Sequence, residues 1–322
     1  MEFEKAIEFL RTRDNFLLSS HVNPDGDGVG SILGMLGLLQ KLGKNYTVIT
    51  EDKPQEKLSF LQRFDEFTPY NHEMKGKLSF SSAIIIDSPH LERIGTPAQL
   101  LAKDAQILNI DHHVSSERFG TVNLIIPSAA ASAQVVAGLF DRLKIAIDQD
   151  SADALYVGLS VDTGRFRFNN TTAEVFRLAA RLVEAGVQPD LIADELYYQT
   201  SMANKTGLAK VLESIELHFD GKVATSFLGH EFLNSPDGKD VDTEGFVNQP
   251  MSIEGVLVAV LIRENEKGKT RVSLRSRNDI DVNAIAGQFG GGGHVRASGC
   301  RMEGSIQEVK AKLLAAIGPH VK

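Results

Sequence analysis

The chain has 322 residues, of which 42% are hydrophobic and 24% charged, so it is neither a disordered chain nor a coiled coil or collagen-like fibre. Its 34 Lys and Arg residues against 42 Asp and Glu residues give a net charge of −8, which argues against a protein that coats long duplex DNA. The single cysteine, Cys300, excludes an internal disulfide. No apolar run approaches the ~20 residues of a membrane span, and the first residues lack a signal-peptide pattern, so we expect a cytoplasmic protein without a membrane partner.

The first half of the chain alternates short apolar runs with helical patterns. The expected strands cover residues 16–20, 46–50, 83–86, 106–110 and 122–126. The expected helices cover residues 29–42, 130–143, 151–161 and 172–185, and Gly43 is expected to cap the first of them. Continuous β-branched runs are typical of parallel strands buried on both faces. We therefore predict an α/β N-terminal domain with a Rossmann-like, mostly parallel sheet.

The pattern changes near residue 190. Helices are expected at 189–198 and 202–217, and from residue 222 the chain is rich in strand patterns joined by turns. The expected strands are 223–228, 255–263 and 269–276, with a hairpin loop at 264–268 and helices at 281–289 and 305–317. We predict an N-terminal domain over residues 1–186, a linker over 187–204 and a smaller α+β domain over 205–322.

Four short segments carry acidic or histidine side chains directly after an expected strand or at the end of an expected helix. They are residues 21–27, 87–90, 111–113 and 162–164. Each aspartate taken alone would be interpreted as a helix cap or a turn residue. In an open α/β sheet, however, ligands bind outside the carboxyl ends of the strands, so we expect the four segments to converge on one place.

Several carboxylates in one place repel each other unless cations neutralise them. Oxygen donors mixed with imidazole suit Mn²⁺ or Mg²⁺, whereas structural zinc sites prefer thiolates. Two divalent ions about 3.5–4 Å apart, bridged by a carboxylate, form a clamp for phosphoryl displacement. The sequence therefore predicts a centre for two divalent ions, with Mn²⁺ preferred to Mg²⁺.

Two motifs resemble a known family. Asp111-His112-His113 after an apolar strand, with His21-x-Asn23-Pro24-Asp25-Gly26-Asp27 upstream, resembles the DHH phosphoesterase family. Gly290-Gly291-Gly292-Gly293-His294 resembles the glycine-rich motif of the associated DHHA1 domain. The resemblance covers nearly the whole chain, and the chain length resembles the stand-alone nano-RNase and oligoribonuclease branch. Members of that branch also often dephosphorylate 3′-phosphoadenosine 5′-phosphate (PAP).

The resemblance implies a role for each matching residue. The metal ligands would fall into two groups that share one carboxylate: His21 and Asp25 for one ion, Asp27, His112 and Asp162 for the other, and Asp87 between them. His113 would face the scissile phosphate, and Asp111 would orient its neighbours. The family pattern leads us to expect an acidic position in the helix after the fifth strand, where this chain has Gln134.

Four consecutive glycines by themselves indicate only a flexible hinge. Here His294 follows them directly, and Arg275, Arg277 and Arg296 lie nearby in the sequence. Glycine lets backbone N–H groups approach a phosphate closely, and arginine binds phosphate through a fixed fork. We therefore predict that nucleotides are bound by Arg275, Gly291, Gly292, Gly293 and His294.

We expect a hydrolase that degrades short oligoribonucleotides to mononucleotides, as an exonuclease, or removes the 3′ phosphate of PAP. Its partners would be these small substrates and, by resemblance, a second copy of the chain in a homodimer. A phosphodiesterase for cyclic or linear dinucleotides could use the same site. A manganese-dependent inorganic pyrophosphatase is disfavoured by the Gly290–His294 motif, and an inactive nucleotide-binding module by the presence of all six implied ligands.

Overall fold

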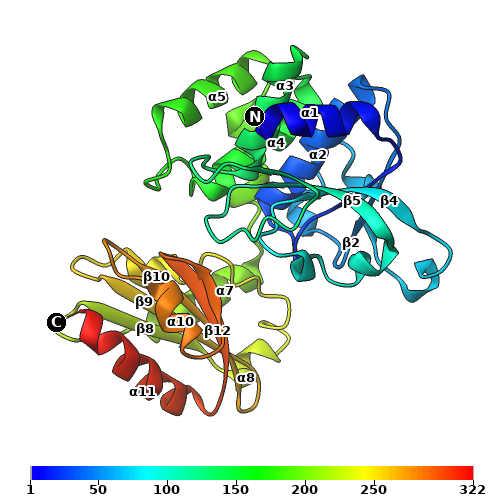
Figure 1. The fold of residues 1–322 in the computed structure, drawn as a ribbon. Helices are drawn as coiled ribbons and strands as arrows, with labels where there is room; N and C mark the ends of the chain where they lie inside the picture. Colours follow the sequence, from blue (N-terminus) through cyan, green and yellow to red (C-terminus); the bar gives the residue numbers. More distant parts are fainter. Residues whose placement is uncertain (1, 322) are drawn as a thin grey trace. The chain divides into compact units, whose positions relative to one another are not determined.

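The computed structural model describes residues 2–321, and the chain divides into two compact units at Gln199 and Thr200 (Figure 1). Each unit has its own six-stranded sheet and its own hydrophobic core. The expected linker contains helix α6 (Pro189–Ala193), a π-helical turn (Asp194–Tyr198) and the start of α7 (Met202–Glu213). Within residues 2–321, no helix is both long and apolar enough to cross a bilayer.

The N-terminal unit is built on a parallel sheet, as predicted. Its strands are β1 (Phe16–Ser19), β2 (Tyr46–Thr50), β3 (Thr68–Pro69), β4 (Phe80–Ile86), β5 (Leu101–Asp111) and β6 (Val122–Ile125). Their order is β3-β2-β1-β4-β5-β6, and every pairing is parallel. The strand order reverses between β1 and β4, and in such sheets the crevice at the reversal point is where ligands bind.

Alternate residues of the central strands enter two cores. Leu18 and its register partner Ile84 face the main core, which is covered by helices. These are α1 (Glu2–Thr12), α2 (Gly26–Lys41), α3 (Ser132–Leu143), α4 (Gln149–Asp162) and α5 (Ala173–Glu184). Leu17 and Ile85 face a smaller core covered by the 3₁₀ turns Leu91–Ile94 and Thr96–Leu100. The sheet is thus covered by α-helices on one face and by short turns on the other.

Helices α2 and α4 pack closely because α2 presents glycines to α4. A Cβ on Gly30 would collide with the carbonyl oxygen of Ala154, and a Cβ on Gly26 would lie 2.5 Å from Val161 Cγ2. Only a residue without a side chain allows helix axes to approach this closely. The contact places the first turn of α2 beside the last turn of α4, which is where two of the predicted site segments lie.

The ends of α2 follow from its flanking residues. The helix begins at Gly26, earlier than the expected residue 29, because the Asp25 side chain accepts the N–H groups of Asp27 and Gly28 at 2.9 and 3.2 Å. The periodicity of apolar residues does not indicate this start, because the first turn of the helix contains glycines. At the other end Gly43 adopts a φ of +66°, the left-handed conformation that follows many helices, as predicted.

The C-terminal unit contains a mixed sheet of order β11-β12-β10-β9-β8-β7. Its strands are β7 (Glu216–His218), β8 (Val223–Leu228), β9 (Val258–Glu266), β10 (Lys269–Ser276), β11 (Gly292–His294) and β12 (Ala297–Glu303). One face packs under α10 (Val282–Gly287) and α11 (Ile306–Ile317). The other face packs under α7, α8 (His230–Leu233) and α9 (Asn248–Met251). The predicted smaller α+β domain is therefore present.

Three expectations about this unit need correction. The helix expected at 202–217 ends at Glu213, because residues 216–218 pair with β8 as strand β7. The hairpin loop expected at 264–268 is shorter, since β9 runs to Glu266 and β10 begins at Lys269. The glycine run enters the sheet, because residues 292–294 pair with β12, which was itself not expected.

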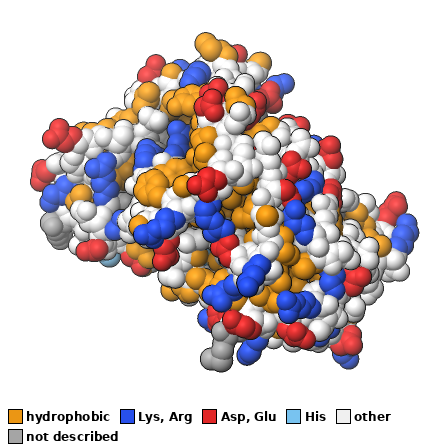
Figure 2. All heavy atoms as spheres, turned by 90° about the horizontal axis from the view of Figure 1, so that it is seen from above, with side chains coloured by type: hydrophobic (Ala, Val, Ile, Leu, Met, Phe, Trp, Pro, Cys, Tyr) orange, Lys and Arg blue, Asp and Glu red, His pale blue; other side chains and the backbone are white. Residues whose placement is uncertain are grey.

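The face of the molecule in Figure 2 carries basic and acidic side chains interspersed with apolar ones. This distribution agrees with the net charge of −8.

Candidate metal centre

The four segments singled out in the sequence lie together in the N-terminal unit. Two follow strands β1 and β4, one ends β5, and one ends helix α4. Potential ligand atoms lie within 4.8 Å of one another in three groups: His21, Asp25 and Asp87; Asp27, His112 and Asp162; and Asp87, His112 and His113. All six residues implied as metal ligands are therefore in one cluster.

Asp87 connects two of these groups. It follows β4 directly, is buried, and has a φ of +58°, a conformation that non-glycine residues adopt mainly where the surroundings enforce it. Its N–H donates to the Ile110 carbonyl at 2.9 Å, which fixes the backbone against β5. Its Oδ2 lies 3.5 Å from His21 Nε2, and its Oδ1 lies 3.7 Å from His112 Nε2. The two oxygens of one carboxylate thus face different groups.

The first group is placed by the turn between β1 and α2. His21 Nδ1 lies 2.9 Å from the Val22 carbonyl, which can only accept, so Nδ1 carries the proton and Nε2 faces the carboxylates. His21 Nε2 lies 4.0 Å from Asp25 Oδ1. Asp25 also caps α2, so this residue is both a helix cap and a candidate metal ligand.

The second group joins α2, β5 and α4. His112 Nε2 lies 3.1 Å from Asp162 Oδ2 and 3.9 Å from Asp27 Oδ2. The Nδ1 of the same ring lies 3.3 Å from the Ala129 carbonyl, which fixes the proton on Nδ1 as in His21. The close packing of α2 against α4 is what brings Asp27 and Asp162 to the same imidazole.

Asp27 is held by the start of helix α3. Its Oδ2 accepts the N–H of Ser132 at 2.6 Å, and its Oδ1 accepts the N–H of Ala133 at 2.9 Å and the hydroxyl of Ser31 at 3.1 Å. The N-terminus of a helix stabilises a negative charge. The Ser132 hydroxyl also donates to Asp87 Oδ1 at 3.1 Å, so one serine contacts both carboxylates. Sequence reasoning missed Ser132 because its contacts are to residues far away in the chain.

Asp111 fixes the orientation of His113. The fully buried Asp111 Oδ1 accepts the backbone N–H groups of His112 and His113 at 2.8 and 3.2 Å. It also accepts the Nδ1–H of His113 at 2.7 Å. A carboxylate can only accept here, so it sets the tautomer of the ring. His113 Nδ1 lies 3.7 Å from Asp87 Oδ1, which places the ring at the edge of the cluster.

Carboxylates in this cluster are electrostatically strained. Burial and repulsion from Asp162 and Asp87 raise the pKa of Asp27 well above its usual value. Burial, with repulsion from Asp25 and Asp87, raises the pKa of Asp162 to about 6 against the opposing contact with His112. Burial and Asp87 also raise the pKa of Asp25. The carboxylates therefore require neighbouring positive charge in order to ionise.

Histidines supply that charge when they are protonated. Burial disfavours the imidazolium of His21, but its contact with Asp87 outweighs burial and raises the pKa to about 9. For His112, contact with Asp162 likewise outweighs burial and raises the pKa to about 10. Burial opposes ionisation of Asp87, yet contacts with His21, His112 and His113 lower its pKa below the usual range.

The donor set suits hard or borderline divalent cations. Carboxylate oxygens and neutral imidazole nitrogens are ligands for Mn²⁺ and Mg²⁺, and no thiolate lies in the cluster, since Cys300 belongs to the C-terminal core. Cations here would relieve the repulsion that raises the carboxyl pKa values. Both the donor atoms of the cluster and its charge balance are therefore suited to divalent cations.

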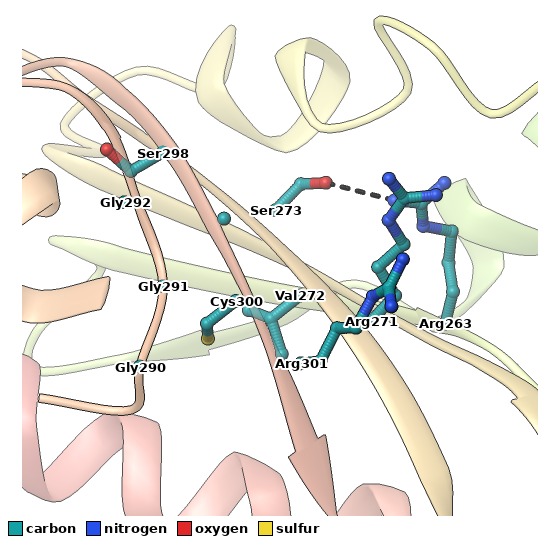
Figure 3. Close-up of a pocket in the computed structure, with 11 residues that line it drawn as sticks. Arg263, Arg271, Val272, Ser273, Gly290, Gly291, Gly292, Ser298, Cys300 and Arg301 are labelled. Atoms are coloured by element: carbon teal, nitrogen blue, oxygen red, sulfur yellow. Dashed lines mark hydrogen bonds between the residues drawn. The ribbon is translucent and has the colours of Figure 1, made fainter. Parts of the chain in front are cut away.

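The predicted nucleotide-binding residues lie in the C-terminal unit. Gly291 and Gly292 line a pocket of about 510 Å³, which Figure 3 shows. Gly293 and His294 follow Gly292 in the exposed strand β11 and are not among the residues that line this pocket. Arg275 is half-buried on β10, also outside that lining, and burial lowers its pKa despite attraction to Glu244.

Three other arginines line this pocket, and the sequence analysis did not single them out. They are Arg263 on β9, Arg271 on β10 and Arg301 on β12. A signal existed in β10, where alternate positions 269, 271, 273 and 275 are polar. The alternation indicates which residues share a face but not which residues of β9 and β12 lie beside them.

Comparisons with known proteins agree with the geometry of both units. The model of the DHH family N-terminal domain matches residues 15–159, and that of the DHHA1 domain matches residues 220–319. The bifunctional oligoribonuclease and PAP phosphatase NrnA of Thermus thermophilus is 33% identical over 93% of this chain and 88% of its own length. The protein of the same name from Bacillus subtilis is 27% identical over 91% of each chain.

A solved structure has the same fold throughout. The crystal structure of an exopolyphosphatase-related protein from Bacteroides fragilis matches with a TM-score of 0.93 and 26% identity. The match covers 99% of this chain and 96% of that one.

Proposed function

Because the chain belongs to the DHH family of phosphoesterases, we propose that it hydrolyses short oligoribonucleotides to mononucleotides and PAP to AMP and phosphate. The names of the two similar NrnA proteins support these substrates. The single observation that carries the proposal is the position of Asp87, whose two oxygens face two separate ligand groups. Such a pair of groups suits a two-ion clamp on a phosphate.

The proposed centre holds two divalent ions, with Mn²⁺ preferred. His21 and Asp25 would bind one ion, and Asp27, His112 and Asp162 would bind the other, with Asp87 contributing to both. Carboxylate mixed with imidazole supports Mn²⁺ ahead of Mg²⁺, which favours all-oxygen sites. When bound, the ions would supply Lewis-acid charge at the phosphate and a water of lowered pKa.

The protein's own groups would position the substrate and move protons. Asp111 holds the Nδ1–H of His113, so Nε2 is the nitrogen we assign to the scissile phosphate. As the imidazolium, with Nε2 also protonated, it would donate a hydrogen bond to a non-bridging oxygen. Alternatively it would give that proton to the leaving oxygen and return to the neutral tautomer that keeps the proton on Nδ1. Asp111 is a positioning residue, because it accepts from the ring of His113 and from the backbone N–H groups of His112 and His113.

We assign nucleotide binding to the C-terminal unit. Arg275 and His294 would contact phosphate or base, and the backbone of Gly291–Gly293 would approach the phosphate closely. The resemblance to the DHHA1 motif supports this assignment, and the half-buried guanidinium of Arg275 is suited to a charge-assisted contact. We also infer a homodimer in the cytoplasm, to be tested by light scattering of the purified chain and by cell fractionation.

A substrate panel with Mn²⁺ tests the proposal. PAP and pyrophosphate are followed by phosphate release, and a 5′-phosphorylated diribonucleotide and a cyclic dinucleotide by anion-exchange chromatography. We expect mononucleotides from the diribonucleotide and AMP from PAP. Hydrolysis of pyrophosphate alone, or of the cyclic dinucleotide alone, would assign a different reaction, and inactivity on all four would indicate a binding module. Asp87→Ala protein purified in parallel controls for contaminating nucleases.

A further inference from the structure

Three arginines lie side by side on neighbouring strands of the C-terminal sheet. Arg271 on β10 is the direct register partner of Arg263 on β9 and of Arg301 on β12. Directly paired residues of antiparallel strands point to the same face, about 5 Å apart. We call Arg263, Arg271 and Arg301 the arginine row. Figure 3 shows their guanidinium groups gathered on one side of the pocket.

Among residues 2–321, no Asp or Glu side chain forms an ion pair with an arginine of the arginine row. Burial and repulsion from Arg271 lower the pKa of Arg263 to about 10, despite attraction to Asp242. Arg263 donates to the hydroxyls of Thr243 and, at 3.3 Å, of Ser273, but its Nε is buried without a hydrogen-bond partner in the described chain. Like charges directly opposite each other destabilise a sheet, so an anion bound here would stabilise it.

The pocket beside the row leaves room for such an anion. Its volume is about 510 Å³, and Gly290–Gly292 line the side opposite the arginines (Figure 3). Gly299, the register partner of Ser273 on β12, contributes no side chain to the floor. Glycine backbone on one side and guanidinium groups on the other are both suited to phosphate oxygens.

The arginine row is separate from Arg275. Arg275 lies four residues further along β10, which corresponds to about 14 Å of strand, and is not among the residues that line the pocket. The row itself spans about 10 Å across three strands, since neighbouring strands are about 5 Å apart. A row of that length suits successive phosphates of an extended chain better than one isolated ion.

We propose that the arginine row binds backbone phosphates of a single-stranded oligoribonucleotide, at a subsite distinct from Arg275 and His294. The proposal rests on the proposed function, which makes oligoribonucleotides the substrate class. Arginine is suited to this contact because its planar fork matches phosphate oxygens. The arginine row would increase the affinity for longer RNA and would not act on the bond that is cleaved.

Direct binding to the full chain tests the proposal. The anisotropy of a fluorescein-labelled five-nucleotide RNA is measured in EDTA, so that no cleavage occurs, with Arg271→Gln and with Arg301→Gln. Each variant is expected to raise Kd about fivefold to tenfold and to reduce the slope of log K against log salt by about 0.7. Arg271→Lys, which keeps the charge but loses the fork, should fall between Arg271→Gln and the wild type.

Lys312→Gln is the matched control. It removes one exposed positive charge from α11, which packs on the opposite face of the sheet, and should leave Kd unchanged. An equal loss in Lys312→Gln would mean that only net charge matters, and it would overturn the proposal. Unchanged RNA affinity in a folded Arg271→Gln/Arg301→Gln double variant would overturn it as well. Thermal melting by circular dichroism establishes folding of each variant.

Two further measurements separate the remaining outcomes. Competition of ATP with the labelled RNA tests whether the pocket binds a free nucleotide instead. Variants that lose ATP binding but retain RNA binding would assign the pocket to a free nucleotide and contradict the proposal. Turnover of bis(p-nitrophenyl) phosphate by the wild type with Mn²⁺ tests the proposed function independently. If that turnover is absent while the anisotropy differences remain, the proposed function fails and the arginine row stands.

Discussion

The hydroxyl of Ser132 donates to Asp87 Oδ1 at 3.1 Å, while the backbone N–H of the same residue donates to Asp27 Oδ2 at 2.6 Å. One residue at the start of α3 therefore fixes two carboxylates, one from the first turn of α2 and one from the end of β4. Because Asp87 faces both ligand groups, a small rotation of its carboxylate would change the geometry of each group.

Ser132→Ala removes only the hydroxyl contact to Asp87. A hydrogen bond to a charged group contributes about 1.5–3 kcal/mol, so we expect kcat on PAP to fall by roughly tenfold to a hundredfold. Ser31→Ala, which removes a hydroxyl contact to Asp27 alone, is the matched control and should have the smaller effect. Steady-state kinetics decides this, and equal losses in the two variants would contradict a special role for the contact to Asp87.

Metal binding should depend on pH in a defined direction. In the metal-free protein Asp162 has a pKa raised to about 6, and His21 and His112 have pKa values raised to about 9 and about 10. All three groups then bind more protons in the folded than in the unfolded state, so metal-free stability falls as pH rises from about 5.5 to about 8. Metal binding displaces those protons.

The increase in Tm produced by Mn²⁺ should therefore be larger at pH 8 than at pH 5.5. Differential scanning fluorimetry in EDTA and in Mn²⁺ at both pH values measures it. An equal increase at the two pH values would show that Mn²⁺ does not compete with protons at this cluster.

Activity should be lost in EDTA and should return best with Mn²⁺.

The two units should contribute differently to different substrates. Arg275→Ala and His294→Ala should each lower kcat/KM for a dinucleotide by roughly tenfold to more than a hundredfold, since a charge-assisted phosphate contact contributes about 1.5–3 kcal/mol. Both should leave hydrolysis of bis(p-nitrophenyl) phosphate nearly unchanged, because this small ester does not require the C-terminal unit. His113→Ala should lower the turnover of every substrate. Equal losses on both substrates in the Arg275 variant would exclude the C-terminal unit from recognition.

Packing between α2 and α4 should be sensitive to a single methyl group. Gly30→Ala would place a Cβ against the Ala154 carbonyl, and overpacking of this kind lowers the free energy of unfolding by about 1–3 kcal/mol. Gly287→Ala is the control, since a Cβ there meets nothing within 4 Å and alanine favours a helix. Urea unfolding measures both, and a Gly30→Ala protein as stable as wild type would show that the helices can separate without loss.

Sequence reasoning identified the candidate ligands because they lie in short polar segments directly after apolar strands. Parallel strands align their carboxyl ends, so residues such as His21 and Asp87 reach the same edge whatever the loop details. Ser132 escaped the same reasoning because its partners, Asp27 and Asp87, are 105 and 45 residues away in the chain. No local pattern indicates which backbone N–H group a distant carboxylate will meet.

Other elements were missed for local reasons. Helix α1 has charges along most of its length, and only Ala6, Phe9 and Leu10 are buried. Strands β11 and β12 consist largely of small residues, whose preference for strands is weak. Strand β12 is held by pairing with β10, and β11 by pairing with β12. The arginine row depends on the register of three strands, which alternation within one strand does not determine.

In the proposed two-ion centre, Asp87 is the carboxylate shared by both ions. Asp87→Ala should impair both ion sites and lower turnover by at least about a hundredfold, in the range of losing a major electrostatic stabiliser. Asp162→Ala should weaken mainly one site, because its carboxylate contacts His112 and belongs to one ligand group.

Metal content measured by mass spectrometry, alongside turnover of PAP, tests this most directly. The wild type should hold two Mn²⁺ ions per chain, Asp162→Ala about one, and Asp87→Ala neither tightly. An Asp87→Ala protein that retained two tightly bound ions and near-normal turnover would contradict the central claim.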